Sequence, residues 1–350
     1  MIRWRRGVVT AVGRTWPGAL ELTAALPDGT ELPALAHPPL VGTPEVGDVV
    51  LLNAAALELG LGTGGHALVV ALPDRLPADA DGPGHLVKAR YTPLQVVVQG
   101  ADEQGSPTHA LLTDEAPLPG TPVVVADLHS SLPAVLAGVL AARPGTRVAY
   151  AMTDGGALPL WLSRTVAALA PHLVGTVTVG QAYGGDLEAV SLHSGLLAAV
   201  RVLEAEVVVV TQGPGNLGTG TPWGFSGVAA GEAVNAAAAV GARPVAALRM
   251  SAADPRERHR GVSHHSRTAY GRVALAVADV VVPASARALV DAADFRRQRL
   301  VEVGDDGLLD VLRPWAPLLS TMGRGLDDDP LAFVAAAAAG QHAASLLQGS

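Results

Sequence analysis

The first part of the chain alternates apolar and polar positions in short runs, and a period of two predicts half-buried β-strands. Such runs occupy residues 7–12, 19–24, 49–52 and 67–71, with turn signals of Gly, Pro and Asp between them. Short strands at this spacing are typical of small all-β folds. The pattern therefore predicts a small β-barrel or sandwich domain over residues 1–75.

The apolar pattern changes at about residue 121. Continuous apolar runs, typical of strands that are covered on both faces, occupy residues 123–125, 148–150, 177–179, 207–210, 245–248 and 280–282. Segments of helical length that are rich in alanine and leucine include residues 132–142, 158–170, 187–203 and 228–240. This alternation predicts an α/β domain with a Rossmann-like, doubly wound, mostly parallel sheet over residues 121–350. Residues 76–120 form the predicted linker and bridging segment.

Composition narrows the class of protein. Of the 350 residues, 49% are hydrophobic and 16% are charged, which predicts a large buried core. The net charge of −8 argues against a nucleic-acid partner, because phosphate binding needs a basic surface. The absence of cysteine excludes disulfides and thiolate chemistry. Lys88 is the only lysine, and this preference for arginine suggests a bacterium with GC-rich codons.

The same composition predicts where the protein acts and with what. No apolar stretch reaches the roughly 20 residues of a membrane helix, and no long apolar run follows the basic start of the chain. We therefore expect a cytoplasmic protein without membrane contact. A surface with so few charges also predicts a homodimer.

Chemistry-bearing residues follow five of the six predicted strands. The segments that follow these strands are residues 127–131, 153–156, 180–188, 211–221 and 249–254, and they carry Gly, Asp, His, Ser, Thr or Arg. Right-handed crossovers place these strand ends along one edge of a parallel sheet, where ligands of such folds bind. We therefore expect the site at this edge.

A glycine-rich loop after the fourth predicted strand is the clearest signal. Its candidate ligand-binding residues are Gly213, Gly215, Gly218, Thr219, Gly220 and Thr221. Glycines let an anion approach the backbone amides, and the two hydroxyls add donors. The loop matches neither familiar phosphate motif, so a tightly packed crossover without ligand is the alternative. Gly184, Gly185 and Asp186, after the third strand, are further ligand-binding candidates.

Positive and imidazole groups crowd the end of the fifth predicted strand. Arg249, Arg256 and Arg260 are candidates for binding an anion, because guanidinium groups suit phosphate and carboxylate. His259, His264 and His265 are candidate acid–base groups. With nearby aspartates the histidines could instead hold a metal, although their spacing matches no standard zinc motif. A surface loop or dimer contact rich in arginine is the plainer alternative.

Two aspartates and a histidine complete the candidate catalytic set. Asp127 and His129 are two positions apart, so in an extended segment their side chains point the same way. Asp154 follows the next strand. A Ser-His-Asp relay can be written with Ser130 or Ser263, but no Gly-x-Ser-x-Gly nucleophile motif is present. Asp127 and Asp154 could also serve only as helix caps.

These loops carry a family resemblance. The sequence resembles the bacterial domain-of-unknown-function family numbered 3866, and the likeness extends over essentially the whole chain. The segments that carry it are residues 90–95, 128–130, 152–155, 184–190, 213–221, 256–265 and 320–325. Gln181 stands where the resemblance implies histidine. The resemblance implies no activity.

The sequence thus predicts an enzyme that acts on a small phosphorylated or nucleotide-like anion. The glycine-rich loop would cradle the anion, the arginines would neutralise it, and the histidines with Asp127 or Asp154 would move protons. The alternative is a non-catalytic sensor of such an anion, or an assembly subunit. The sequence leaves both a cofactor and a metal open.

Overall fold

The computed structural model describes residues 1–62 and 64–347, and the chain divides into two compact units. One unit contains Met1–Val98 together with Trp161–Ala167, and the other contains Gln99–Leu160 and Ala168–Ser350. The bridging segment expected at 76–120 is thus shared between the two units.

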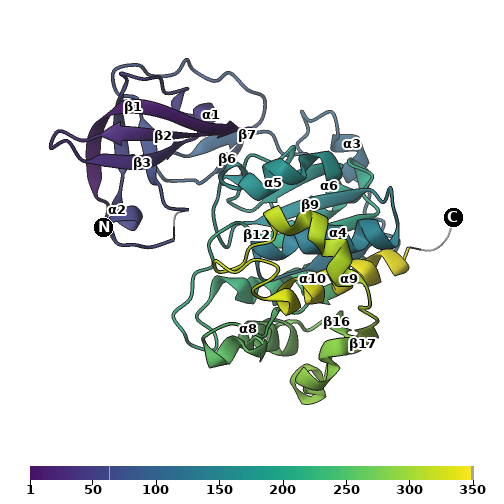
Figure 1. The fold of residues 1–350 in the computed structure, drawn as a ribbon. Helices are drawn as coiled ribbons and strands as arrows, with labels where there is room; N and C mark the ends of the chain where they lie inside the picture. Colours follow the sequence, from purple (N-terminus) through teal and green to yellow (C-terminus); the bar gives the residue numbers. More distant parts are fainter. Residues whose placement is uncertain (63, 348–350) are drawn as a thin grey trace. The chain divides into compact units, whose positions relative to one another are not determined.

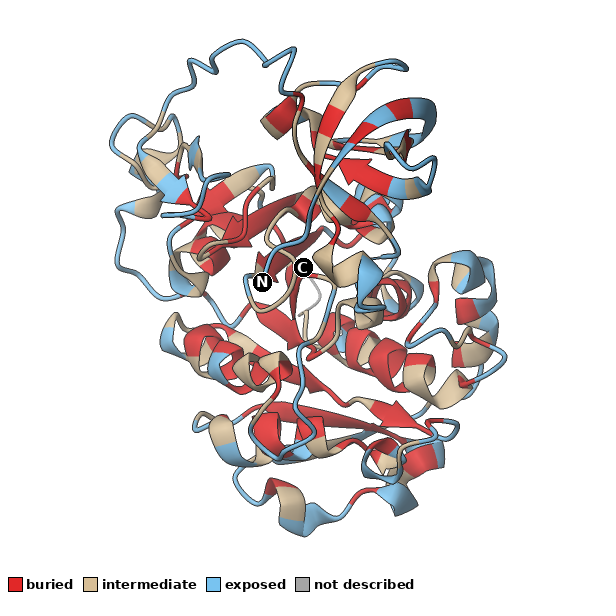
Figure 2. Ribbon diagram, turned by 90° about the vertical axis from the view of Figure 1, so that its left-hand side faces the viewer, coloured by how far each residue is buried: buried red, intermediate tan, exposed pale blue. Residues whose placement is uncertain are grey.

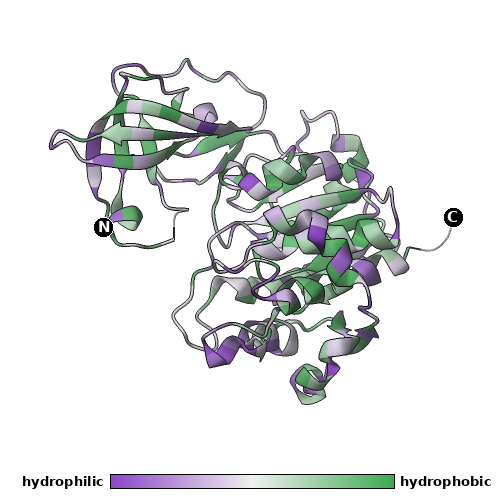
Figure 3. Cartoon of the chain, viewed as in Figure 1, coloured by the Kyte–Doolittle hydropathy of each residue, from purple (hydrophilic) through white to green (hydrophobic). Residues whose placement is uncertain are grey.

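The first unit is built on a closed five-stranded barrel in the order β1-β2-β3-β5-β4 (Figure 1). Its neighbouring strands are antiparallel, except that β3 and β5 run parallel. The barrel strands show alternating hydrophobic and hydrophilic bands (Figure 3), since every second side chain points into the core. The strands are β1 (Trp4–Trp16), β2 (Ala19–Ala25), β3 (Glu31–Ala36), β4 (Val49–Asn53) and β5 (Ala67–Ala71).

Shorter elements complete this unit. The helices α1 (Pro38–Val41) and α2 (Ala55–Glu58) lie in the connections of the barrel, and β6 (Leu86–Lys88) pairs with β7 (Val96–Val98). Trp161 also belongs here: the Trp16 indole nitrogen donates a hydrogen bond to its carbonyl oxygen at 2.7 Å. A side chain at Gly18 would overlap the Trp161 ring. The predicted small β-domain is confirmed as a barrel.

The second unit contains an eight-stranded sheet in which every pair of neighbours is parallel. Its six inner strands are almost wholly buried (Figure 2), whereas the edge strand β17 (Arg299–Val303) has no buried residue. The Rossmann-like α/β prediction is therefore confirmed. In spatial order the strands are β11 (Leu187–Ala189), β10 (Gly175–Val179), β9 (Val148–Thr153), β12 (Val207–Gln212), β8 (Pro122–Val125), β13 (Arg243–Ala247), β16 (Asp279–Pro283) and β17 (Arg299–Val303).

Helices cover both faces of this sheet. The helix that follows β8, α4 (Leu132–Ala142), packs on α10 (Pro330–Ser345) and α9 (Leu308–Leu312). The helix that follows β12, α7 (Ala229–Ala239), packs instead on α6 (Leu192–Arg201). The neighbours β8 and β12 thus send their connections to opposite faces. Such a reversal opens a crevice at the carboxyl ends of the strands.

Small residues let α4 and α10 touch through their backbones. A Cβ at Gly138 would lie 2.0 Å from the carbonyl oxygen of Ala337, and one at Gly340 would lie 2.0 Å from that of Val135. Such a contact leaves no room for side chains between the helices. The alanine-rich α10 is therefore fixed to α4 by close approach rather than by large apolar groups.

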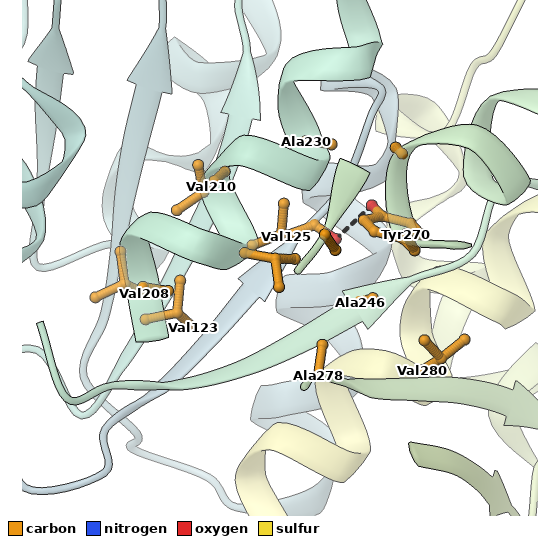
Figure 4. Packing of buried hydrophobic residues seen from close by; sticks show 14 of the residues in the cluster. Val123, Val125, Val208, Val210, Ala230, Ala246, Tyr270, Ala278 and Val280 are labelled. Atoms are coloured by element: carbon orange, nitrogen blue, oxygen red, sulfur yellow. Dashed lines mark hydrogen bonds between the residues drawn. The ribbon is translucent and has the colours of Figure 1, made fainter. Parts of the chain in front are cut away.

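The face that carries α7 contains the main apolar cluster (Figure 4). Val123 and Val125 of β8 pack there with Val208 and Val210 of β12. The hydroxyl of Tyr270, in the π-helical turn Ala269–Val273, donates a hydrogen bond to the carbonyl oxygen of Val125 at 2.9 Å. This bond fixes the turn to the end of β8, directly before the residues of the candidate site.

Three expectations differ from the structure. The edge strands β11 and β17 were not predicted. The helix expected at 187–203 starts only at Leu192, because Ser191 caps α6 and the residues before it pair with β10. The helix expected at 158–170 is a 3₁₀ turn at Leu160–Leu162 followed by α5 (Arg164–Leu169), with the Ser163 hydroxyl accepting from the Val166 amide.

Among the described residues, no helix combines the length and the apolar character that crossing a bilayer would require. Two further short helices are α3 (His109–Leu112), between β7 and β8, and α8 (His264–Thr268), which belongs to the candidate site.

Candidate functional site

The site lies at the carboxyl edge of the second unit's sheet, where β8, β12 and β13 end. A small cavity there is bounded by the ends of β8, β9 and β12 and by the start of α7. Its lining includes Asp127 after β8, Gln212 at the end of β12, and Ser226 and Gly227 before α7. The cavity thus occupies the crevice that the reversal of connections between β8 and β12 creates.

Asp127 is the most unusual group at this edge. Its side chain is 1% exposed, and neither carboxyl oxygen has a hydrogen-bond partner. The nearest charged or ionisable groups are Nδ1 of His265 at 3.4 Å and the Arg249 guanidinium at 4.0 Å from Oδ2. Gly227 packs against it, since a Cβ there would lie 3.2 Å from the Asp127 Cβ. A buried carboxylate without hydrogen bonds costs stability and is typical of a functional site.

Asp127 is not isolated in this respect. Five of the seven buried side-chain atoms that lack a hydrogen bond among the described residues belong to this edge: Asp127 Oδ1 and Oδ2, Gln212 Oε1, Asn216 Nδ2 and His264 Nε2. Buried polar atoms in native proteins are normally satisfied by protein, water or an ion. Their concentration here indicates that the edge is built to receive a polar ligand.

The three predicted histidines come together beside Asp127. The strands β14 (Met250–Ser251) and β15 (Gly261–Val262) pair and close the arginine- and histidine-rich segment into a loop. The ring centroids of His259, His264 and His265 are 4.4–5.0 Å apart. One ring nitrogen of each lies within 4.8 Å of the other two.

Ser263 and Phe225 orient these rings. Ser263 caps α8 by accepting a hydrogen bond from the His265 amide, and its Oγ lies 2.7 Å from Nδ1 of His259. Phe225 stacks flat on His265, with 3.8 Å between ring centroids, and meets His264 edge-on. Each ring is thus fixed by at least one neighbour.

The pKa values of two of these imidazoles are strongly lowered. Burial lowers the pKa of His259 to about 3, and the Arg249 guanidinium lowers it further. Burial likewise lowers the pKa of His264 to about 4, with a contribution from His265. Both rings are therefore neutral at pH 7 and keep a lone pair for a proton or a metal ion.

The arginines divide into two groups. Arg249 is 10% exposed, and its guanidinium lies 3.1 Å from Nδ1 of His265. Burial lowers the pKa of Arg249. Arg256 instead forms a two-pronged pair with Asp254 at 2.9 Å, which holds the pKa of that carboxyl well below its usual range. Arg260 donates to the carbonyl oxygen of Asp254 at 3.0 Å.

A second cavity adjoins this arginine network. Arg324 donates to Asp254 and to Asp329, both at 3.2 Å. The Ser130 hydroxyl, just before α4, donates to the Thr321 hydroxyl at 3.1 Å. The polar residues of its lining are Ser130, Ser131, Arg249, Ser251, Asp254, Thr321, Arg324 and Asp329. Arg249 lines this cavity while its guanidinium contacts His265, so the cavity adjoins the three histidines.

The glycine-rich loop folds back on itself. The Thr219 amide donates to the carbonyl oxygen of Gly224 at 2.7 Å, and the Leu217 amide donates to Ser226 Oγ at 3.0 Å. The hydroxyls of Thr219 and Thr221 bond to the backbone of Gly224. Gly218 pairs with Phe225, so the fold of the loop returns the chain to the histidines.

Gly213 serves close packing, whereas Gly215 and Gly220 serve backbone turns. A Cβ at Gly213 would lie 2.4 Å from the carbonyl oxygen of Ala157. Gly215 and Gly220 have φ values of +94° and +80° and face open space. The packing and the turns of the described loop therefore explain glycine at these three positions without a bound ligand.

The family of the chain can now be stated. The family model described as "Protein of unknown function (DUF3866)" matches residues 33–340. The chain belongs to this family. The resemblance inferred from the sequence is thereby confirmed. No curated protein and no solved structure matches the chain. The family description names no activity.

Segments that carried the family resemblance meet at the second cavity. Ser130 comes from residues 128–130 and Thr321 and Arg324 come from residues 320–325, whereas Arg256 of residues 256–265 reaches the cavity only through its pair with Asp254. Arg324, Phe225 and Gln212 were not among the predicted site residues, and Ser263 was considered only as the nucleophile of a Ser-His-Asp relay. The inclusion of residues 320–325 in the resemblance was the only signal for Arg324.

Other predicted site residues lie elsewhere. Nδ1 of His129 lies 3.0 Å from the Tyr150 hydroxyl, and the residue begins a 3₁₀ turn, so it does not extend in line with Asp127. Asp154 accepts a hydrogen bond from the Gln181 amide at 2.9 Å. Asp127 does not cap the 3₁₀ turn or α4 that follows it, because their cap residues are Leu128 and Ser131.

The Gly184–Asp186 segment lies apart from the histidines. Its amides bond within the loop, with Gly184 donating to Glu188 at 2.7 Å and Gly185 to Thr178 at 3.1 Å. Asp186 accepts from both the amide and the hydroxyl of Thr176 at 2.8 Å. Thr176 is near the amino end of β10, so the loop has returned to the opposite edge of the sheet.

Proposed function

We propose that the protein is an enzyme that hydrolyses a small phosphorylated or nucleotide-like anion at the carboxyl edge of the second unit's sheet. The single observation that carries this proposal is the position of Arg249. Its nearly buried guanidinium contacts His265 and Asp127 on one side, and the residue lines the second cavity. A phosphate bound to Arg249 would therefore be within reach of the histidines.

The second cavity has the chemistry of an anion site. Arg249 and Arg324 supply positive charge, and Ser130 and Thr321 supply hydroxyls beside the first turn of α4. Arg324 is already neutralised by Asp254 and Asp329. Among the described residues, Arg249 has Asp127 at 4.0 Å and a weaker attraction to Asp254 but no hydrogen bond to a carboxylate, so it has more to gain than Arg324 from an added anion.

The Asp127 and histidine groups would activate water. In hydrolysis, the water oxygen bonds to phosphorus as the ester bond breaks, a proton leaves the water, and the leaving oxygen gains one. Asp127 has an oxygen without hydrogen bonds, and His259 and His264 have neutral imidazoles that accept protons. These groups therefore provide the acceptor that the reaction needs.

In this proposal the anion is held by Arg249, whereas the sequence-based hypothesis gave that role also to the glycine-rich loop, Arg256 and Arg260. A role for residues 213–221 as a phosphate cradle stays a prediction, since two of their amides already bond within the loop. Arg256 and Arg260 are engaged by Asp254, so they would shape the cavity rather than hold the anion. The homodimer, the cytoplasmic location and the absence of a nucleic-acid partner also stay predictions.

A turnover screen tests the proposal. Full-length protein is incubated with phosphomonoesters, phosphodiesters and nucleotides, and released phosphate and products are measured. Arg249→Gln is expected to lower kcat/KM by about 100-fold or more, because the developing charge loses a buried cation. Arg272→Gln is the matched control, since Arg272 is exposed and stacks on Trp223.

Two results would overturn the proposal. One is equal turnover by the Arg249 and Arg272 variants, which would place the reaction elsewhere. The other is thermal stabilisation of the wild type by a phosphate compound without any turnover, which would favour an anion sensor instead.

A further inference from the structure

We propose that His259, His264 and His265 bind one divalent metal ion of the Zn²⁺ type through their Nε2 atoms and leave a coordination position open for water. The role of the ion in turnover rests on the proposed function. With the ion bound, His259 and His264 would be ligands and no longer proton acceptors, the bound water would be the hydrolytic nucleophile, and Oδ1 of Asp127 would be the acceptor of its proton. The binding of the ion stands on the geometry alone.

The ring nitrogens of the three histidines lie close enough together to reach one ion. One ring nitrogen of each histidine lies within 4.8 Å of the other two. Bonds of about 2.0–2.1 Å to a tetrahedral zinc ion place nitrogen ligands roughly 3.3 Å apart. The set therefore has to contract as it binds the ion, and His264 is the least buried of the three residues.

The groups behind two of the rings determine which nitrogen faces the ion. Ser263 Oγ occupies Nδ1 of His259 at 2.7 Å. Nδ1 of His265 lies 3.4 Å from Asp127 Oδ2. Metal-binding histidines regularly donate their other ring N–H to a carboxylate or similar acceptor, which fixes the ring and strengthens it as a ligand. Nε2 is then the atom left for the metal.

Arg249 also lies 3.1 Å from Nδ1 of His265, and the two neighbours demand different tautomers. Arg249 can only donate, whereas Asp127 can only accept when ionised. Asp127 Oδ2 is buried and has no hydrogen bond. A proton on Nδ1 of His265 would relieve that cost, so we assign the proton there and the lone pair to Nε2.

His264 supplies the independent sign of a ligand. Its Nε2 is buried and has no hydrogen-bond partner. A histidine that only packed against Phe225 would gain by turning this nitrogen to a partner or to water. Together with the unpartnered carboxylate of Asp127, this atom indicates a cation that is an integral part of the site.

The donor set selects the class of ion. Three imidazoles suit zinc, cobalt, nickel and copper, whereas magnesium and calcium prefer oxygen ligands. Three protein ligands with an open position are typical of catalytic rather than structural zinc. Neutral imidazoles leave the charge of the ion in place, so the site would attract the anion that Arg249 holds.

Metal titration of the full-length protein tests the inference. After removal of metals with a chelator, Zn²⁺ or Co²⁺ is added and binding is followed by calorimetry and by the visible absorption of Co²⁺. We expect one ion per chain, with the intense absorption of low-coordinate Co²⁺. His259→Gln and His264→Gln should weaken binding by about 100-fold or more, and Asp127→Asn by about 10–100-fold.

His193→Gln is the matched control, because His193 is exposed on α6 of the same unit. Circular dichroism and thermal unfolding of each variant separate loss of the metal from loss of the fold. No stoichiometric binding by wild type, or binding by His264→Gln equal to that by His193→Gln, would overturn the inference.

The inference and the proposed function fail separately. Phosphate-ester hydrolysis that persists after all metal has been removed would overturn the role of the ion in turnover and leave the enzyme proposal standing, whereas a wild type that binds no ion would overturn the metal site itself. Tight binding of one ion that depends on His259 and His264 supports the metal site, even where no phosphate compound is turned over.

Discussion

The ring of Phe225 lies flat on the ring of His265, with 3.8 Å between the centroids and 3° between the planes. Phe225 is brought there by the glycine-rich loop, whose Gly218 pairs with it. The loop thus contributes to the histidine centre through an aromatic ring as well as through its backbone.

Phe225→Leu should therefore weaken the metal site. Leucine fills much of the volume but cannot hold the His265 ring by stacking, so we expect Co²⁺ affinity to fall about tenfold. The free energy of unfolding should fall by about 1 kcal/mol. Trp223→Leu, at an exposed position of the same loop, is the control for both measurements. Equal Co²⁺ affinities in the two variants would contradict the role given to Phe225.

Gly213 and Gly220 should respond differently to alanine. The added Cβ at Gly213 would meet the Ala157 carbonyl oxygen at 2.4 Å, and we expect Gly213→Ala to lower the free energy of unfolding by about 3 kcal/mol. Gly220 faces open space with φ at +80°, so Gly220→Ala should cost only about 1 kcal/mol. Urea unfolding measures both. Equal losses would show that packing against Ala157 is not what Gly213 provides.

His129 should make stability depend on pH. Burial lowers the pKa of His129 to about 4 in the folded protein, against about 6.5 in an unfolded chain. Between these values the unfolded chain binds a proton that the folded chain does not, so stability falls as pH drops from 6.5 to 4. Below pH 4 this contribution levels off.

His129→Gln should make the decline of Tm between pH 6.5 and pH 4 shallower, measured by thermal unfolding of the metal-free protein. His193→Gln, at an exposed position, provides the reference slope. A His129 variant whose slope matched that reference would contradict the assignment.

Asp279 should matter for stability but not for the site. It is buried at the amino end of β16, where it pairs with Arg243, Arg299 and His342. Asp279→Asn should lower the free energy of unfolding by about 2 kcal/mol, less than for a fully buried pair because both arginines are partly exposed.

Co²⁺ affinity should stay unchanged in this variant, because Asp279 is at the opposite edge of the sheet from the histidines. Asp310→Asn removes an exposed pair with Arg313 and should change the free energy of unfolding by less than about 0.5 kcal/mol. A loss of Co²⁺ binding in Asp279→Asn would mean that the two edges of the sheet are coupled.

The large sheet could be predicted because its inner strands are continuous apolar runs. The strand β17 was not predicted, because the exposed Arg299 and Glu302 interrupt its apolar run. The strand β11 was not predicted, because its three residues are too few to form a recognisable pattern. The parallel order followed from the helices between the strands. The local sequence pattern did not show that the neighbouring strands β8 and β12 send their connections to opposite faces of the sheet.

The cluster of His259, His264 and His265 beside Asp127 could be predicted in part. His259, His264 and His265 are close in the sequence, and Asp127 follows a recognisable strand. Asp186 was misplaced because a residue after a strand was assumed to stay at that edge, whereas its loop returns to Thr176. Phe225 and Ser263 depend on how two loops fold, which their residue types do not reveal.

The backbone contact between α4 and α10 has a consequence for the newly made chain. During synthesis the ribosome releases α4 long before α10, so β13 and β16, on which α10 packs, lack this cover until residues 330–345 emerge. Asp329, which directly precedes α10, also holds Ser251 and Arg324 beside the second cavity. Docking of this late helix therefore covers β13 and β16 and brings Asp329 to Ser251 and Arg324 beside the second cavity in one step.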